Sequence, residues 1–324
     1  MRTPKDPASS YRADKVSPVT RFDEVETTLS HLFRRPHPAL GGRSFGSALY
    51  QGLSQRGLLA QARVVELGAG AGFLAAAMAE AGGPGLDYTF VELSPVLLAV
   101  QRRQLPSATG VLAHAERLPF ASGSIHGLFL ANEVIADLRV LPAHHPEALE
   151  LVRRDRLEEG PGLVNVGALH LVEELARVLA PGACACLTEF GGDRSPAPVP
   201  LEGPLGVGRH VEHSIHFGHL EKTAALRGLD CERVLLADVV GIDRTMRVCS
   251  YPDVLRLRRL LPRLSVLAWP KAELEAAHPL LTRLFRFEFP RIGDPGFPDP
   301  KAEGGFCQLF QALLLRQPSR RPVV

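Results

Sequence analysis

The sequence predicts a doubly wound α/β fold, in which a mostly parallel, seven-stranded sheet is covered by helices on both faces. Short apolar runs alternate with helical patterns between residues 62 and 240, as in chains that build parallel sheets. A glycine-rich turn follows the first apolar run, and an acidic residue ends the second. Turns and acids at these positions are typical of nucleotide-binding sheets.

The elements follow one another in a regular order. Apolar runs predict strands at 62–67, 88–93, 110–113, 125–131, 183–190, 231–239 and 306–316. Helical spacing predicts helices at 23–33, 44–55, from the glycine turn through 81, at 94–104, 164–179 and 221–228. Ser94 and Pro95 are a typical N-cap and first helical residue, so they fix the start of one helix.

Four parts of the chain differ in pattern. We expect an N-terminal arm and helical cap at 1–60, an α/β core at 61–240, a helical and loop insertion at 241–305, and the last strand of the core sheet at 306–318. Residues 139–162 are a second, shorter surface insertion. Long extra segments near strand ends commonly form lids or substrate walls, which is the role we expect for 241–305.

Composition excludes several classes of protein. The net charge of +2 on 324 residues gives no reason to expect nucleic-acid binding. The polar N-terminus has no hydrophobic signal core, and no apolar run is long enough to span a membrane, so a soluble, cytoplasmic protein without a membrane partner is expected. The five cysteines are odd in number and lack CxxC spacing, which favours buried thiols in a reducing cytoplasm and no metal site.

The glycine-rich turn has the clearest functional signal. It reads Glu66-Leu67-Gly68-Ala69-Gly70-Ala71-Gly72, between a strand and a helix. Glycines let the backbone approach a ligand closely, and the helix N-terminus favours polar ligand groups. Residue 73 is Phe, so the spacing is GxGxG and not the GxGxxG of nucleotide oxidoreductases. A purely structural tight turn is the alternative.

Acidic and polar residues follow the next strands. Glu92 ends the second strand, about 20 residues past the glycines, where a carboxylate can accept hydrogen bonds from ribose hydroxyls. Leu93 follows it directly. His114-Ala115 comes after the third predicted strand, and Asn132-Glu133 after the fourth. The ends of parallel strands share one edge, so a single ligand site is expected there.

These motifs resemble those of class I S-adenosylmethionine (SAM)-dependent methyltransferases over residues 62–190. ELGAGAGFL is similar to the family's first motif, FVELSP to its ribose-binding acid, and AERLPFASGSIHGLFLANEV to its third and fourth strands. The resemblance implies a Rossmann-like fold with SAM as cofactor. The cofactor-binding residues that it implies are Glu66, Gly68, Gly70, Gly72, Glu92, Leu93, His114, Ala115 and Asn132. At position 114 the family usually has an Asp that contacts the adenine amino group. Here either the His114 ring or a neighbouring backbone group would accept the hydrogen bond from that amino group.

Within that superfamily, residues 60–240 resemble the MidA-like branch, which includes a complex I assembly factor that methylates protein arginines. The resemblance rests on VELSPVLLAVQRRQL (91–105), LTEFG (187–191) and EHSIHFGHL (212–220). It implies an arginine acceptor. Two departures weaken that implication: Gly218 replaces an Asp, and Asp137 lies one residue later than the branch's acid, turned by about 100° on a helix.

Methyl transfer from a sulfonium is an in-line displacement, which needs alignment in a shielded cavity and a base only if the acceptor carries a proton. The candidate catalytic residues are Glu133, Glu189 and His216, although each acid could instead cap a helix. His210, His213, His216 and His219 recur every third residue, and this spacing drifts by about 60° per step on a helix, so four cannot share one metal.

Two classes of function stay open. One is an active methyltransferase acting on a nitrogen or oxygen of a protein or peptide side chain, arginine among them, or of a small metabolite. The other is a catalytically weak SAM-fold protein that serves as a binding or assembly factor. An open acidic groove beside Glu133 and Glu189 would favour a protein acceptor, and a closed apolar cavity a metabolite. A homodimer is compatible with either.

Overall fold

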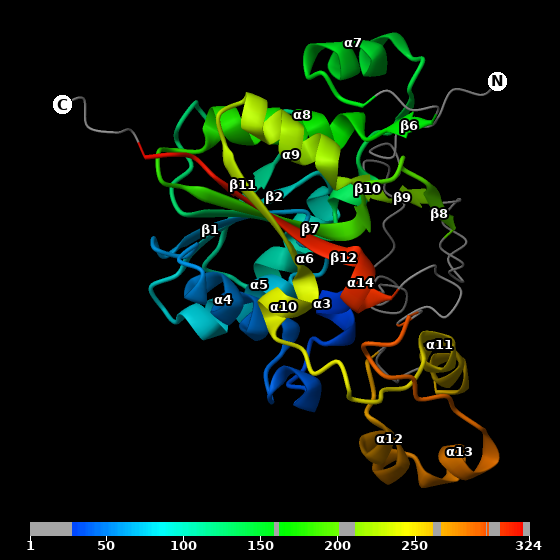
Figure 1. Ribbon diagram of the computed structural model, residues 1–324. Coiled ribbons are helices and arrows are strands. Elements are labelled where there is room, and N and C mark those ends of the chain that lie inside the picture. Colours follow the sequence, from blue (N-terminus) through cyan, green and yellow to red (C-terminus); the bar gives the residue numbers. More distant parts are fainter. Residues whose placement is uncertain are drawn as a thin grey trace.

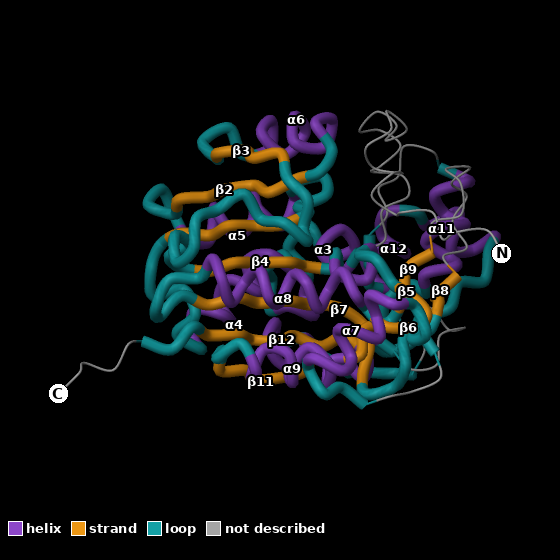
Figure 2. Tube along the Cα trace, turned by 90° about the horizontal axis from the view of Figure 1, so that it is seen from above, coloured by secondary structure: helices purple, strands orange, loops and turns teal. Residues whose placement is uncertain are grey.

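The computed structural model describes residues 28–158, 162–200, 211–261, 267–295, 297 and 305–319. Its main sheet has the strand order β11-β12-β7-β4-β1-β2-β3, and β10 pairs with β7. The strands are β1 (Arg63–Leu67), β2 (Asp87–Glu92), β3 (Thr109–Leu112), β4 (Leu128–Asn132), β7 (Cys184–Gly192), β10 (Ile215–His216), β11 (Asp230–Leu235) and β12 (Phe310–Arg316). Figure 2 shows the strands of the main order side by side, from β3 at one margin to β11 at the other. The predicted fold class is confirmed.

The parallel strands end at a common level. Leu67 of β1 is in register with Val91 of β2 and Ala131 of β4, and Asn132 is in register with Thr188 of β7. Only β12 runs antiparallel to its neighbours β7 and β11. The residues that follow β1, β2, β4 and β7 therefore meet at one edge, called here the carboxyl edge.

Helices cover both faces of the sheet because alternate strand residues point to opposite sides. In β4, Leu128 and Leu130 pack into one buried cluster, while Phe129 and Ala131 pack into the other. One face carries α4 (Phe45–Gln55), α5 (Phe73–Gly82), α6 (Pro95–Gln104) and α10 (Leu236–Val240); the other carries α8 (Val166–Val178) and α9 (Phe217–Leu226). Figure 1 shows these two layers with the sheet between them.

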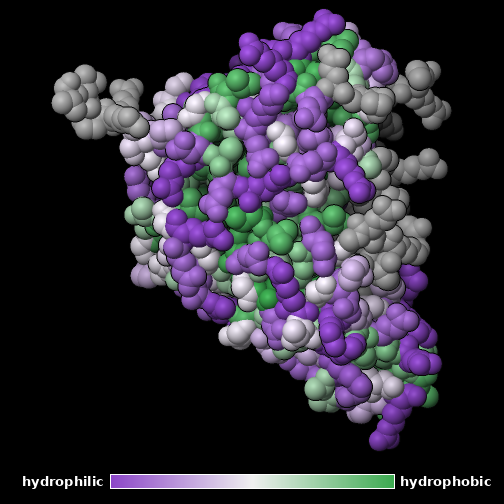
Figure 3. Space-filling view, viewed as in Figure 1, coloured by the Kyte–Doolittle hydropathy of each residue, from purple (hydrophilic) through white to green (hydrophobic). Residues whose placement is uncertain are grey.

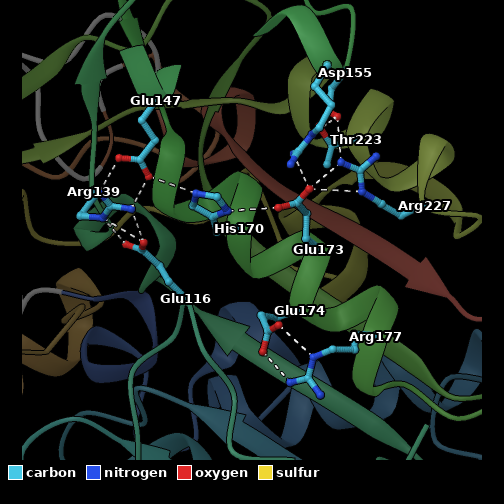
Figure 4. Close-up of polar contacts among 11 residues, drawn as sticks. Glu116, Arg139, Glu147, Asp155, His170, Glu173, Glu174, Arg177, Thr223 and Arg227 are labelled. Carbon is cyan, nitrogen blue, oxygen red and sulfur yellow. Dashed lines mark hydrogen bonds and ion pairs between the residues drawn. The ribbon is translucent and has the colours of Figure 1, made fainter. Parts of the chain in front are cut away.

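The short insertion after β4 folds onto α8. It contains η2 (Ile135–Asp137), β5 (Leu141–Pro142), α7 (Pro146–Arg154) and β6 (Leu163–Val164). A chain of hydrogen-bonded ion pairs ties it to α8 and α9, running through Glu116, Arg139, Glu147, His170, Glu173, Arg227 and Asp155 (Figure 4). Asp155 is fully buried at one end of this network, which gives the insertion a fixed position.

The remaining elements lie outside the two helical layers, several of them beyond the carboxyl edge. They are α3 (Leu29–Leu32), η1 (Pro38–Leu40), β8 (Pro198–Pro200), β9 (Val211–His213), α11 (Tyr251–Leu260), α12 (Lys271–Ala277), α13 (Pro279–Leu284) and α14 (Phe306–Leu309). Figures 1 and 2 both place α11 and α12 on that side of the sheet. Within the described ranges, every helix is too short or too polar to reach across a bilayer.

Three of the predicted strand boundaries differ from the structure by three residues or more. The fourth strand begins at Leu128 and not at 125, because Gly127 turns the chain with a φ of +90°. The strand predicted at 231–239 ends at Leu235, and α10 follows. The last strand begins at Phe310, after the short helix α14. Short apolar runs fit a strand and a buried helix equally well, which explains the last two errors. Of the helix predicted at 23–33, residues 23–27 lie outside the described ranges.

Candidate functional site

The glycine turn links β1 to α5 in a backbone conformation that requires glycine. Gly68, Gly70 and Gly72 have φ values of +64°, +53° and +83°. The Gly68 N–H donates to the Val91 carbonyl at 3.0 Å, and a Cβ on Gly68 would lie 2.5 Å from Val134 Cγ2. Gly72 is the N-cap of α5, so the helix starts at the turn. Side chains are therefore excluded where a ligand would approach the backbone.

Glu92 lies beside this turn, and its carboxylate is held from three sides. The Leu93 and Ser94 N–H groups donate to Oε1 at 2.8 and 3.0 Å, and Gln101 Nε2 donates to Oε2 at 2.7 Å. Burial raises the Glu92 pKa, and these three hydrogen bonds act to lower it. A carboxylate has about four acceptor sites, so about one remains for a ligand hydroxyl.

Gln101 was not singled out from the sequence, yet its side chain links Glu92 to the glycine turn. It is fully buried on α6, and its Nε2 also donates to the Gly70 carbonyl at 3.0 Å. Its Oε1 is buried without a hydrogen-bond partner among the described residues. The one sequence signal is a polar residue on the apolar face of a helix (VLLAVQ). Gln101 thus fixes Glu92 relative to the glycine turn.

Glu66 lies behind the turn in a buried pair with Tyr88. The Tyr88 hydroxyl donates to Glu66 Oε2 at 2.7 Å. Burial raises the pKa of Glu66 to about 7, the hydrogen bond from Tyr88 opposes this shift, and the charge of Glu92 adds to it. Glu66 therefore acts on the site indirectly, through its hydrogen bond with Tyr88 and its electrostatic interaction with Glu92.

We predict a pH dependence from Glu66. The ordinary pKa of 4.5 applies to the unfolded chain, so between pH 4.5 and 7 the folded protein holds a proton that the unfolded chain has lost. Without cofactor, the free energy of unfolding should fall across this window by about 3 kcal/mol. Glu66→Gln should remove this contribution, so the variant gains stability relative to wild type at pH 8 but not at pH 5. Urea unfolding of both proteins at the two pH values measures this; an equal difference at both would contradict it.

His114 follows β3 at the carboxyl edge, beside the buried Ala115. Its Nδ1 accepts a hydrogen bond from the Glu116 N–H at 3.2 Å. In the neutral ring the proton then lies on Nε2, which can donate but not accept. This geometry therefore favours a backbone group, and not the His114 ring, as the acceptor of a hydrogen bond from the adenine amino group.

Polar residues at the ends of β4 and β7 form the other half of the site. Asn132 accepts from the Thr188 hydroxyl at 2.9 Å and donates to Glu133 Oε1 at 3.2 Å. The Glu189 carboxylate is buried and accepts from the Ala136 and Phe190 N–H groups, each at 3.1 Å. The structure thus brings Asn132, Glu133 and Glu189 together.

The acids at this place influence one another. The pKa of Glu189 lies well above its ordinary value, first because of burial and then because of the charges of Glu212 and Glu133. Glu212 was not predicted as a site residue; it lies on β9, which follows residues outside the described ranges. The charges of Glu133 and Glu212 thus favour the protonated form of Glu189, and these two charges favour a cationic ligand.

His216 lies beyond β7, at the start of α9. Its Nδ1 accepts from the His219 N–H at 3.2 Å, and the two rings stack with centroids 3.7 Å apart. Burial lowers the pKa of both, that of His219 to about 4. Asn165, another residue missed in the sequence, accepts from the His216 N–H at 3.0 Å. Both rings are therefore neutral at pH 7. His210 lies outside the described ranges, and within them no group of three or more potential ligands could hold a metal.

The comparisons with known proteins identify a methyltransferase domain in this chain. Residues 64–155 match the model of a methyltransferase domain. The chain is 30% identical over 135 residues to the demethylmenaquinone methyltransferase of Chlorobaculum parvum, covering 41% of this chain and 43% of that protein. The chain therefore spans less than half the length of this curated relative.

Two solved structures are similar in outline. One, from Burkholderia thailandensis and bound to S-adenosyl-homocysteine (SAH), is 16% identical with a TM-score of 0.49, covering 96% of this chain and 91% of that one. The other, a SAM-dependent methyltransferase from Mesorhizobium loti, is 15% identical with a TM-score of 0.39, covering 82% and 97%.

The domain match shows a methyltransferase domain at residues 64–155, within the α/β sheet described above. SAM is the cofactor of such domains.

Proposed function

We propose that the protein transfers a methyl group from SAM to a basic nitrogen, on a protein or peptide side chain such as arginine or on a small metabolite. The observation that carries this proposal is the link made by Gln101, which holds the glycine turn and Glu92 together as one cofactor cradle. Glu92 keeps about one acceptor site for a ribose hydroxyl. The Gly68 to Gly72 backbone would face the rest of the cofactor.

The remaining predicted cofactor contacts are part of the same proposal. Leu93 would lie against the adenosine next to Glu92, and a backbone group near Ala115 would accept the adenine amino group. Asn132, at the end of β4, would meet the methionine part of SAM. Glu66 would act from behind the turn through its charge.

The negative charges of Glu133 and Glu212 beside the buried Glu189 support a cationic or basic acceptor. Glu189 is the acid that we propose to face the acceptor side, and His216 lies farther along the same edge. The His216 Nδ1 accepts from the His219 N–H, so its neutral ring carries the proton on Nε2 and would donate a hydrogen bond to the acceptor. The resemblance to the MidA-like branch supports arginine as one such acceptor.

A second candidate acceptor comes from the curated relative, which is a demethylmenaquinone methyltransferase. A small aromatic metabolite would need a largely apolar wall, for which the segment 241–295 is the candidate. A binding or assembly role with little catalysis is the third outcome. All five cysteines are free thiols, which supports a reducing compartment such as the cytoplasm.

Calorimetric titration with SAM and SAH tests the cofactor site. We expect micromolar binding by the wild type and an affinity at least about tenfold lower in Glu92→Ala, because a charged hydrogen bond to the ribose is lost. Asp87→Ala is the matched control, since Asp87 is an exposed acid at the opposite end of β2. Equal SAM affinity in the two variants would reject the assignment of Glu92.

An assay with labelled SAM then distinguishes the candidate methyl acceptors. Arginine-containing peptides, small amines and small quinols are offered in turn, and Glu189→Gln should lower turnover of a cationic acceptor while SAM affinity is kept. Turnover of the quinol alone would favour the second candidate. SAM binding without transfer to any of them would favour the binding role.

A further inference from the structure

Thr188 is a polar residue in the interior of the sheet. It lies on β7, between β4 and β12, and has no exposed surface. Polar side chains cover much of the surface in Figure 3, where they face water. The Thr188 hydroxyl is shielded from water, and the residue paired with it on β12 is the apolar Ala312. A buried hydroxyl is costly unless it has a hydrogen-bond partner, so its partner is a specific feature of the fold.

The Thr188 side chain binds the last residue of β4. Asn132 is in register with Thr188, and its Oδ1 accepts from the Thr188 hydroxyl at 2.9 Å. The backbone of Thr188 holds the next residue, because its carbonyl accepts from the Glu133 N–H at 2.9 Å. Two successive residues at the carboxyl edge are thus fixed by one residue of the neighbouring strand.

The Thr188 hydroxyl decides which way the Asn132 amide is turned. A carboxamide has an acceptor oxygen on one side and a nitrogen with two N–H groups on the other. With Oδ1 held by Thr188, Nδ2 lies on the side of Glu133 and donates to its Oε1 at 3.2 Å. The reversed amide would bring its oxygen against that carboxylate, which is also an acceptor. The amide as it stands keeps one N–H for a ligand.

Asn132 adjoins the glycine turn. Leu67 of β1 is paired with Ala131 of β4, so the residues that follow them, Gly68 and Asn132, lie next to each other at the carboxyl edge. A Cβ on Gly68 would lie 2.5 Å from Val134 Cγ2, which shows how closely the two strand ends approach. A ligand that lies over the glycine turn therefore reaches the Asn132 amide.

We propose that Thr188 is a positioning residue for the cofactor, because it turns the Asn132 amide so that one N–H meets the carboxylate of the methionine part of SAM. This inference rests on the proposed function, in which Asn132 meets that part of SAM. The amide then donates one N–H to Glu133 and the other to the cofactor, so it separates two negative groups. A reversed amide would place its oxygen between them. Thr188 acts only through Asn132 and does not touch the ligand.

The affinity of the full-length protein for SAH tests this role. Valine has the shape of threonine but no hydroxyl, so in Thr188→Val the Asn132 oxygen loses its donor and the amide is no longer held. Calorimetric titration should show an affinity about tenfold lower than that of the wild type, as for loss of one charge-assisted hydrogen bond. Thr188→Ser keeps the hydroxyl and should bind SAH within about twofold of the wild type.

A ligand without the amino-acid part separates positioning from general damage to the site. Methylthioadenosine has the adenosine and the sulfur of SAH but no carboxylate. Thr188→Val should therefore bind it as the wild type does, while its affinity for SAH falls. Equal losses for the two ligands would mean that the substitution distorts the whole cofactor site, and would overturn the positioning role.

A double-mutant cycle shows whether Thr188 acts through Asn132. Asn132→Ala removes the whole amide, so nothing remains for Thr188 to turn. The variant with both Asn132→Ala and Thr188→Val should lose no more SAH affinity than Asn132→Ala alone. Fully additive losses would show that Thr188 acts elsewhere, and would contradict the proposal.

Thr223→Val is the matched control. The Thr223 hydroxyl is also buried and also donates to a side-chain oxygen, that of Asp155 at 2.9 Å, but it lies on α9 in the ion-pair network of the insertion. This variant should be less stable than the wild type and bind SAH normally. If it lost as much SAH affinity as Thr188→Val, the loss would follow from stability and the proposal would fail.

Two outcomes distinguish this proposal from the proposed function. No binding of SAH by the wild type would overturn the proposed function, and the role of Thr188 with it. Binding by the wild type that Thr188→Val leaves unchanged would overturn only the role of Thr188 and leave the cofactor site standing.

Discussion

Gly70→Val should weaken SAM binding by at least about a hundredfold, or about 3 kcal/mol. Gly70 has a φ of +53°, and its carbonyl accepts the hydrogen bond from Gln101. A β-branched residue there is a steric outlier, so the turn must rearrange and the contact with Gln101 is lost. The added side chain also enters the space where the cofactor approaches the backbone. Calorimetric titration with SAM measures the loss.

Gly241→Val is the control for backbone strain alone. Gly241 ends α10 with a φ of 61° and a ψ of 44°, and nothing lies within 4 Å of a Cβ placed on it. Both variants should lose stability from the left-handed conformation, but only Gly70→Val should lose SAM binding. If the two variants bound SAM equally well, the glycine turn would not be part of the cofactor site.

Asp155→Ala should lower the free energy of unfolding at pH 7 by about 3 kcal/mol, the amount typical for breaking a buried charge pair. The Asp155 carboxylate has no exposed surface and accepts from Thr223 Oγ1 at 2.9 Å, Arg227 Nη2 at 2.8 Å and Arg154 Nε at 3.0 Å. Its removal takes one partner from each of these donors at the junction of α7, α8 and α9, and leaves both arginines with Glu173 as their remaining acidic partner (Figure 4). Unfolding in guanidinium chloride measures the change.

Asp193→Ala is the matched surface control. Asp193 also pairs with an arginine, Arg233, at 2.7 Å, but its side chain is 63% exposed, so its loss should change stability by less than about 1 kcal/mol. Similar losses in the two variants would show that burial does not strengthen the Asp155 network.

The effect of Asp155 should also depend on pH. Burial alone would raise its pKa, but the hydrogen bonds from Arg154, Arg227 and Thr223 outweigh burial and hold the pKa below the ordinary 3.8. Because the folded pKa is lowered, the contribution to stability is full above about pH 4 and is lost as the pH falls through the folded pKa. The difference between wild type and Asp155→Ala should therefore shrink in acid.

The sequence predicted the parts of the site that depend on local signals. The glycine turn, the start of α6 at Ser94 and Pro95, and the acid at the end of β2 each follow from residues a few positions apart. The boundaries at residues 235 and 310 were less accurate, since an apolar run of five or six residues does not distinguish a strand from a buried helical turn.

Contacts between distant parts of the chain were not predictable in this way. Glu133, a candidate at the acceptor side, also accepts from the Leu29 N–H, 104 residues earlier, and this contact was not predicted. Gln101 reaches back 31 residues to the carbonyl of Gly70. The tautomer of His114 follows from one backbone hydrogen bond. Each depends on how separate elements meet at the carboxyl edge, which residue spacing does not encode.

The position of β12 has a consequence for how the chain reaches its folded state. Residues 310–316 lie between β7 and β11, and Ala312 to Leu315 are buried there. During synthesis, β7 and β11 emerge from the ribosome long before β12 does. Until then, both strands expose a row of unpaired backbone groups and an apolar surface. The nascent protein is thus open to aggregation until residues 310–316 are made, and chaperones that hold such intermediates should matter most at that stage.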